Sequence, residues 1–377
     1  MYDMNSPIDE YYDIVVVGAG PAGLGVSILL ERLGLNYLIL ERDSIGASFK
    51  KWPKETRFIS PSFTGNFFKM PDLNAVSPDS SPAFELLTEH PTGEDYVQYL
   101  NGVADYFKLS IETEIAVEKI EDQGGFFIIN TTKKTFGSQY IIWAAGEYQY
   151  PKKDSFDGAE LCTHYSEVSS FSEIKGRDSV VIGAYESGFD ATVNLTKLGK
   201  EVTLVDNENY LELINSDSSY SLSPFTRDRS KNIIDKIDYL PETRVKKVDF
   251  LNGKYLVFTN DDQVISCDDK PIDCTGFDTS LKCVNDLFNF EEDYPLINEF
   301  DESRKTENLF LVGPQVKHGT ALFCFIYKYR QRFAIVAEEI ARRLEVSTLE
   351  IAEALHDYKN NNFYLKDLSC CDDECIC

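Results

Sequence analysis

The chain has 377 residues, of which 43% are apolar, so it is long and apolar enough to form two folded domains. Its formal net charge of −26 argues against nucleic acid and anionic membranes as partners, because both are negatively charged. No apolar run reaches the ~18 residues of a membrane span, and the acidic N-terminus lacks the basic-then-apolar pattern of a signal peptide. We therefore expect a soluble cytoplasmic protein that acts on a small molecule.

A nucleotide-binding pattern opens the chain. Residues 13–17 are a short apolar run typical of a buried parallel strand, and they are followed by Gly18-Ala19-Gly20-Pro21-Ala22-Gly23 and a predicted helix. The first glycine permits a tight turn, the second lets the backbone approach a pyrophosphate, and the third lets the helix pack against the strand. Glu41 ends the next predicted strand, where a carboxylate can bind a ribose. The pattern predicts a dinucleotide site.

The same pattern recurs later in the chain. Four positions of the first copy return at one constant offset of 165 residues, as Gly183, Gly188, Gly199 and Asp206. The second turn, Gly183-Ala184-Tyr185-Glu186-Ser187-Gly188, has Tyr185 where the middle glycine should be. A side chain there obstructs close approach, so we expect the second dinucleotide to lie further out or to bind weakly. A decayed turn that binds nothing remains the alternative.

With both copies in view, the chain resembles the two-dinucleotide-binding flavoprotein superfamily, and within it bacterial flavin-containing monooxygenase-like and bacillithiol-disulfide reductase-like proteins. The likeness covers nearly all of residues 12–345 and includes Trp143-Ala144-Ala145-Gly146, Asp273-Cys274-Thr275-Gly276-Phe277 and the strand 308–313. It implies an α/β fold with two Rossmann-like domains. The NAD(P)H-binding domain, 161–279, would be inserted into an FAD-binding domain, 1–160 plus 280–345, and 346–377 would form a C-terminal helix and a cysteine-rich tail.

The resemblance also implies the cofactors. FAD would bind non-covalently at the first turn, and NADH or NADPH would bind at the second. We assign no metal ligands. The cofactor-binding residues implied are Gly18, Gly20, Pro21, Ala22, Gly23, Glu41, Ala145, Gly146, Gly183, Ser187, Gly188, Asp206, Gly276, Gly313, Thr320 and Ala321.

Several positions depart from the family patterns. Pro314 stands where the family commonly has a flavin-binding Asp, and Ala22 stands where bacillithiol-disulfide reductase-like proteins carry a cysteine. His164 lies two residues too far from Gly158 to match the monooxygenase fingerprint. No Cys-x-x-Cys pair lies in the nicotinamide domain or in the helix after Glu41. We therefore expect no flavin-adjacent dithiol within the folded body.

Two segments are expected beside the flavin. Residues 52–82 are rich in aromatic residues, Ser and Pro, and we interpret them as a wall of the flavin or substrate pocket. A helix from about 322 to 344 should direct its N-terminus at the flavin's pyrimidine edge, as in the superfamily. His318 precedes it and could act as a general acid–base, although a capping or surface role is the alternative for both His318 and Thr320.

The choice of nicotinamide cofactor rests on Asp206 at the end of a predicted strand. A carboxylate there would bond the ribose hydroxyls of NADH and repel the 2′-phosphate of NADPH, so we predict a preference for NADH. Arg227 and Arg229, about twenty residues on, could instead fold back to serve NADPH.

The chain ends in four closely spaced cysteines: Cys370, Cys371, Cys375 and Cys377. The tail could carry electrons as a mobile dithiol with Cys370 and Cys371 as its catalytic pair, because adjacent cysteines form an easily reduced disulfide. It could instead hold a soft metal ion, or have no chemical role. An extended tail from about Tyr358 spans roughly 60 Å at ~3.3 Å per residue, enough to reach its own flavin or that of a partner subunit. The sequence permits a homodimer but does not determine the oligomeric state.

Two enzymatic functions and one non-enzymatic function remain. A monooxygenase-like enzyme would oxidise a small S- or N-containing substrate, and a thiol–disulfide oxidoreductase would use the tail. A redox- or metal-handling accessory protein is the third alternative. We rank the monooxygenase-like function slightly ahead, because the resemblance covers most of the chain and the tail only its end.

Overall fold

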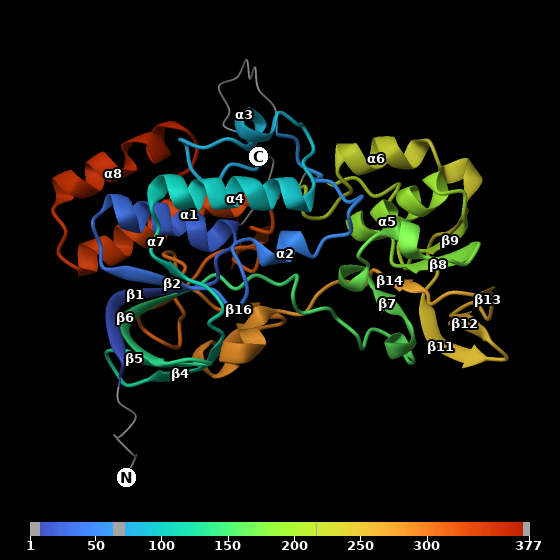
Figure 1. Ribbon diagram of the computed structural model, residues 1–377, viewed down its shortest axis with the longest axis horizontal. Helices are drawn as coiled ribbons and strands as arrows, with labels where there is room; N and C mark the ends of the chain where they lie inside the picture. Colours follow the sequence, from blue (N-terminus) through green and yellow to red (C-terminus); the bar gives the residue numbers. More distant parts are fainter. Residues whose placement is uncertain (1–7, 63–71, 216, 372–377) are drawn as a thin grey trace, which may run out of the picture.

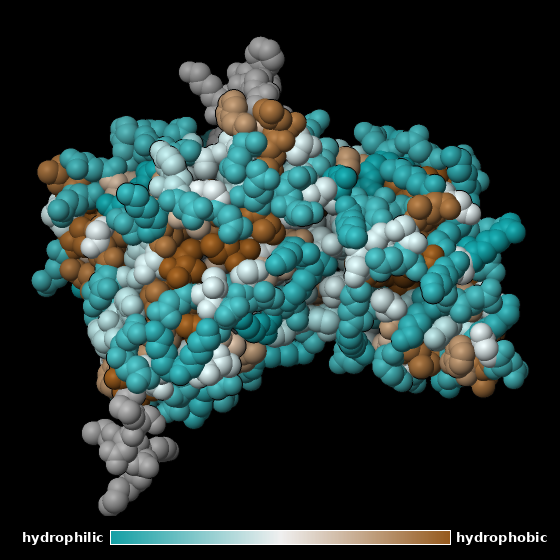
Figure 2. All heavy atoms as spheres, in the orientation of Figure 1, coloured by the Kyte–Doolittle hydropathy of each residue, from teal (hydrophilic) through white to brown (hydrophobic). Residues whose placement is uncertain are grey.

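The computed structural model describes residues 8–62, 72–215 and 217–371 (Figure 1). It has the predicted α/β fold class, with two mainly parallel sheets, each covered by helices. No helix in the described ranges is long and apolar enough to cross a membrane. The surface seen in Figure 2 is mostly hydrophilic, with apolar side chains gathered in smaller patches.

The first sheet has the order β3-β2-β1-β6-β5-β4, and β17 pairs with β6. Strands β1, β2, β3, β6 and β17 run parallel, whereas β4 and β5 form antiparallel pairs at one side. The bounds are β1 Glu10–Val17, β2 Tyr37–Leu40, β3 Ile111–Glu112, β4 Val117–Asp122, β5 Phe127–Thr131, β6 Thr135–Trp143 and β17 Leu309–Leu311. The end of β1 and all of β2 are buried, as their apolar runs predict.

Helices cover this sheet on the upper side in Figure 1. They are α1 Pro21–Arg32, α4 Gly93–Phe107, α7 Ile326–Arg343 and α8 Thr348–Asn360. Helices α4 and α8 each begin with a capping box, in which Thr92 pairs with Asp95 and Ser347 with Glu350. Gly25 of α1 lets Phe333 of α7 pack closely, because a Cβ there would lie 2.1 Å from that ring.

The second sheet has the order β10-β9-β8-β14-β7, all parallel. Its strands are β7 Thr163–His164, β8 Asp178–Ile182, β9 Glu201–Val205, β10 Asp238–Leu240 and β14 Ile272–Asp273. Helices α5 Glu186–Lys197 and α6 Pro224–Lys231 lie above it in Figure 1. Below it lies an antiparallel sheet of β11 Val245–Leu251, β12 Lys254–Thr259 and β13 Val264–Cys267.

The remaining elements are short. They are α2 Ala47–Lys50, α3 Pro82–Leu86, β15 Phe290–Glu291, β16 Tyr294–Pro295, β18 Lys317–His318 and β19 Ala321–Leu322. The chain leaves the first sheet after β6, builds the second sheet, and returns to the first at β17. The second sheet is therefore an insertion between two segments that share the first sheet.

The segment after α8 is packed against the body. Phe363 is fully buried with the Arg330 guanidinium 4.1 Å from its ring centroid, and Arg332 donates a hydrogen bond to the Leu365 carbonyl. Cys371 is 3% exposed. The expectation of an extended tail starting at about Tyr358 is therefore wrong for the segment up to Cys371, because it buries apolar side chains on the first domain.

Candidate active site

A central cavity of about 350 Å³ lies where the two sheets meet. Its walls combine the first glycine turn, the 144–149 segment, the start of α5 and residues 324–329, with an aromatic wall of Phe49, Trp52 and Phe58. The expected contribution of segment 52–82 is found in residues 52–60, whereas 63–71 lie outside the described residues. Since apolar and aromatic side chains dominate the lining, the cavity suits a flat ring system.

The first glycine turn has the local geometry that a pyrophosphate requires. Gly18 has φ of +107°, and a Cβ there would lie 2.7 Å from the Ala144 carbonyl oxygen. A Cβ on Gly23 would lie 1.9 Å from the Gly18 carbonyl oxygen, so this glycine is needed for packing. A Cβ on Gly20, by contrast, would meet nothing within 4 Å, and α1 begins there with no side-chain cap. The free N–H groups at this helix start therefore face open space that a phosphate can fill.

Glu41 anchors the end of β2 beside this turn. Its carboxylate accepts hydrogen bonds from the Ala19 N–H and the Asp43 N–H, each at 2.8 Å. Glu41 lines both the central cavity and a smaller hollow of about 60 Å³ that contains Arg42, Gln149 and Tyr150. The two hollows share Gly18, Glu41, Ala145 and Gln149, so a dinucleotide could run continuously from one to the other. These residues fit FAD.

A separate cavity of about 690 Å³ lies over the second glycine turn, and we call it the nucleotide cavity. It is lined by Gly183, Ser187 and Gly276 among the predicted residues, whereas Gly188 packs beneath it. Tyr185 also lines this cavity, and its hydroxyl donates a hydrogen bond of 3.0 Å to the Ser221 carbonyl oxygen. The side chain in place of the middle glycine is thus held by the 218–221 loop and leaves a cavity that can accept a nucleotide.

Asp206 does not lie in the wall of the nucleotide cavity. It is 0% exposed, and its carboxylate accepts hydrogen bonds from the Tyr239 hydroxyl at 2.7 Å and from two backbone N–H groups. The carboxylate that was predicted to bind a nicotinamide-cofactor ribose is therefore buried and held by protein donors, and its part in the choice between NADH and NADPH stays a prediction.

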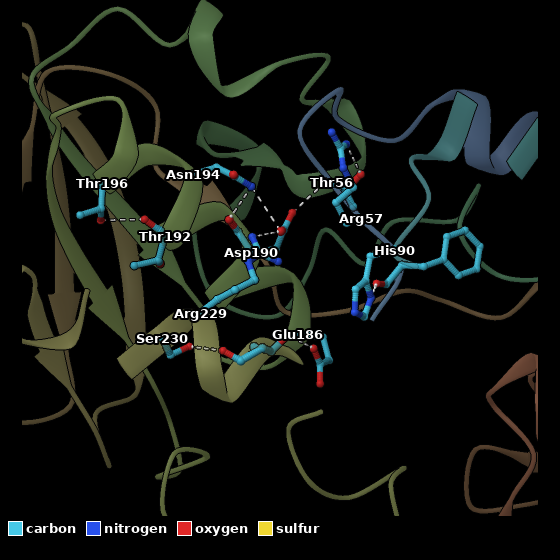
Figure 3. A network of polar contacts seen from close by, with 12 residues as sticks. Thr56, Arg57, His90, Glu186, Asp190, Thr192, Asn194, Thr196, Arg229 and Ser230 are labelled. Carbon is cyan, nitrogen blue, oxygen red and sulfur yellow. Dashed lines mark hydrogen bonds and ion pairs between the residues drawn. The ribbon is translucent and has the colours of Figure 1, made fainter. Parts of the chain in front are cut away.

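Arg227 and Arg229 are also engaged elsewhere. Arg227 donates to the backbone carbonyls of Leu211 and Leu222. Arg229 pairs with Asp190, which also accepts hydrogen bonds from Asn194 and, across the boundary between the two sheets, from Thr56 (Figure 3). Neither arginine lines the nucleotide cavity, so the alternative that they bind a 2′-phosphate is not supported.

The structure places the predicted residues before α7 away from the central cavity. Helix α7 begins at Ile326, four residues later than expected, because residues 317–322 form the β18–β19 hairpin. The His318 imidazole donates a hydrogen bond of 2.6 Å to the Asp301 carboxylate, which also pairs with the fully buried Arg332. In the described ranges the cavity wall here consists of Pro314, Cys324, Phe325, Ile326 and Tyr329, without His318, Thr320 or Ala321. Gly313 lies close to Ala22.

Two titratable side chains in the central cavity were not selected from the sequence. Burial raises the pKa of the Glu147 carboxyl to about 7, and no side-chain hydrogen bond to it is present among the described residues. Burial also raises the pKa of the Cys324 thiol, whereas its hydrogen bond of 3.1 Å to Ser219 and the charge of Lys328 lower it. Both side chains line the central cavity, and the charge of the Glu147 carboxylate adds to the increase in the pKa of Cys324.

Among the described residues that line the central cavity, Cys371, one of the two predicted catalytic cysteines, is absent. The backbone carbonyl of Cys371 accepts hydrogen bonds from the Thr320 N–H at 2.8 Å and from its hydroxyl at 3.0 Å. Cys370 lies in the same short turn, Ser369–Cys371, while Cys375 and Cys377 lie outside the described residues. Within the described ranges no group of three His, Cys, Asp or Glu residues could hold a metal ion.

Comparisons with known proteins agree with this geometry. The chain is 23% identical over 344 residues to bacilliredoxin reductase Bdr of Bacillus subtilis, covering 87% of this chain and 97% of that protein. The solved bacillithiol disulfide reductase Bdr of Staphylococcus aureus superposes with a TM-score of 0.74 at 20% identity, covering 89% of this chain and 99% of that one. A flavin-containing monooxygenase from Stenotrophomonas maltophilia gives a TM-score of 0.68 at 16% identity, covering 89% and 99% of the two chains.

The family model for pyridine nucleotide-disulphide oxidoreductases matches residues 15–313, which include both glycine turns and both parallel sheets. The chain therefore belongs to the pyridine nucleotide-disulphide oxidoreductase family, whose members are FAD- and NAD(P)H-dependent enzymes.

Proposed function

We propose that this protein is a flavoprotein disulfide reductase that uses NAD(P)H to reduce a low-molecular-weight disulfide. The observation that carries the proposal is the central cavity, which Gly18–Ala22 of the first turn share with Glu186 and Ser187 of the second. Such a cavity can bring the reactive ends of two dinucleotides together. The likeness to Bdr proteins over nearly their whole length supports the disulfide chemistry over the monooxygenase-like function that the sequence alone favours.

The residues of the first turn would hold the FAD pyrophosphate, and Glu41 would accept hydrogen bonds from its ribose. Bound there, FAD would accept a hydride from the nicotinamide and supply two electrons to the substrate. The aromatic wall of Phe49, Trp52 and Phe58 would exclude water from the ring system. Within the described ranges, Cys324 is the cysteine that lines this cavity, so it is the thiol placed to attack a substrate disulfide, which would form a mixed disulfide and release one thiol. Two electrons and a proton, supplied from NAD(P)H by way of the flavin, would then break the mixed disulfide, release the second thiol and restore Cys324.

A monooxygenase-like function remains the second candidate. Two observations favour it: the apolar lining of the cavity, and Ala22 at the position where bacillithiol-disulfide reductase-like proteins carry a cysteine. In that case the substrate would be a small S- or N-containing compound and O2 would be the oxidant.

The two candidates separate in one experiment. The enzyme is reduced anaerobically with NADPH, and oxidised glutathione, cystine or O2 is then added while the flavin absorbance is followed. A disulfide reductase should be reoxidised by at least one disulfide faster than by O2, and Cys324→Ser should remove that reaction but leave reduction by NADPH intact. Cys267→Ser, at a buried cysteine that lines neither the central cavity nor the smaller hollow beside Glu41, is the matched control. Reoxidation by O2 alone, with release of an oxygenated substrate, would instead support the monooxygenase.

A further inference from the structure

The end of the nucleotide cavity beside β9 is lined by an arginine side chain. The carboxylate of Asp206 is turned into the protein, where Tyr239 and two backbone N–H groups hold it. The exposed side chains that line the cavity next to this strand end are Asn207 and Arg244. The sequence predicts that the Asp206 carboxylate repels a 2′-phosphate at this strand end. In the structure, the cavity there is lined by the guanidinium group of Arg244 and not by that carboxylate.

The backbone of Arg244 is fixed beside the end of β9. The preceding residue, Thr243, donates its N–H to the Asp206 carbonyl oxygen at 2.8 Å. Asn260 makes two hydrogen bonds to the Arg244 backbone. Its side-chain oxygen accepts from the Arg244 N–H at 2.9 Å, and its own N–H donates to the Arg244 carbonyl oxygen at 2.8 Å. These bonds hold the Arg244 backbone beside the end of β9. In a dinucleotide-binding domain, the ribose of the bound nucleotide lies next to this strand end.

The guanidinium of Arg244 is available for a ligand. It makes no hydrogen bond or ion pair to any described residue, although the chain carries 63 acidic side chains. Glu208 and Glu242 are close in sequence, and neither lines the cavity. Glu186 does line it, but its carboxylate accepts hydrogen bonds from Ser223 and Thr226. The exposed guanidinium of Arg244 is therefore free to pair with an anionic ligand in the cavity, and a phosphate matches its planar pair of donors.

Lys152 provides a second cation elsewhere on the cavity wall. Its backbone N–H donates to the Gly276 carbonyl oxygen at 3.2 Å, which places it beside the turn after β14 and away from the β9 end. Its ammonium group also has no ion pair with a described residue. A cation at this position suits the pyrophosphate, which NADH and NADPH share.

We propose that Arg244 binds the 2′-phosphate of NADPH and makes this enzyme prefer NADPH to NADH. The inference rests on the proposed binding of a nicotinamide cofactor in the nucleotide cavity, and it reverses the preference predicted from Asp206. Losing one charge-assisted pair typically lowers affinity by about tenfold to a hundredfold, so the effect should be measurable.

The test measures binding and needs no turnover. The FAD-loaded enzyme is titrated by calorimetry with adenosine 2′,5′-bisphosphate, with adenosine 3′,5′-bisphosphate as a control of equal charge, and with 5′-AMP. Wild type should bind the 2′,5′-bisphosphate at least about tenfold more tightly than the other two. Arg244→Gln should remove that difference, and Arg244→Lys should restore part of it. Lys152→Gln is the matched control and should weaken all three ligands alike.

The outcomes separate this inference from the proposed function. If wild type binds the three nucleotides equally, or if Arg244→Gln weakens them all to the same extent, the assignment of Arg244 is wrong. NADH and NADPH would in that case still reduce the flavin, and the proposed function would stand. If none of the nucleotides binds and neither cofactor reduces the flavin, the proposed nicotinamide site itself is wrong.

Discussion

The hydroxyl of Thr56 donates a hydrogen bond of 2.7 Å to Oδ2 of Asp190, and this bond joins the two dinucleotide-binding halves of the molecule (Figure 3). Thr56 belongs to the segment that lines the central cavity, and Asp190 lies on α5 of the second domain. Tyr165 donates to the same oxygen at 2.8 Å, and Arg229 donates to the other carboxylate oxygen at 2.6 Å. Asp190 is thus a shared acceptor that sets how the two halves meet.

We predict that Asp190→Asn destabilises the protein by about 3 kcal/mol, because it leaves Arg229 without a counter-charge in a partly buried site. The free energy of unfolding from urea denaturation measures this change. Asp228→Asn is the control, because Asp228 pairs with Lys231 and both side chains are 75% exposed, where an ion pair contributes little. Equal effects of the two substitutions would show that the interdomain network does not stabilise the fold.

We predict that Gly20→Val yields a folded protein that has lost FAD. A Cβ at Gly20 meets no protein atom within 4 Å and its φ is −86°, so the fold tolerates the side chain while the open space for a pyrophosphate is filled. Gly23→Ala should instead impair folding, because its Cβ would overlap the Gly18 carbonyl. Circular dichroism reports folding, and the visible absorbance of the flavin reports bound FAD. A Gly20→Val protein with stoichiometric FAD would remove the first turn from the cofactor site.

We predict that Glu147→Gln changes how stability depends on pH. Burial raises the pKa of Glu147 from its ordinary value of 4.5 to about 7 in the folded protein, so the folded state holds this proton more tightly than the unfolded state. Wild type should therefore lose stability as the pH rises from about 4.5 to 7, relative to the variant. A difference on the order of 2 kcal/mol is expected between pH 5 and pH 8, measured on flavin-free protein by urea denaturation. Parallel profiles would mean that the carboxyl is not desolvated.

We predict that removing residues 372–377 leaves reduction of low-molecular-weight disulfides unchanged, because the proposed thiol Cys324 lies in the central cavity. Removing residues 369–377 should in addition lower the melting temperature, since it deletes the buried Cys371 and the carbonyl that Thr320 binds. Thermal unfolding and disulfide-dependent NADPH oxidation measure the two effects. If Cys370→Ser or Cys371→Ser, or removal of residues 369–377, abolishes disulfide reduction while NADPH still reduces the flavin, the electron-carrying tail becomes the correct mechanism.

The fold class and the first turn were predictable from the sequence because they depend on local patterns. A buried strand, a glycine turn and a helix form one contiguous unit, and Gly18, Gly20 and Gly23 have the steric environments that their spacing predicts. The constant offset between the two copies likewise predicted two parallel sheets, because repeated local units fold alike.

The direction in which a polar side chain points depended on the tertiary structure. Asp206 and Glu41 hold equivalent places in the two copies, yet Glu41 lines a cavity, and Asp206 is turned inward by Tyr239, a residue 33 positions later. Arg244 comes to the β9 end through a backbone bond between Thr243 and Asp206, and His318 is held by Asp301. These pairings join residues that are distant in sequence. Because a buried polar side chain is oriented by the group with which it forms a hydrogen bond or ion pair, a local sequence pattern could not predict these orientations.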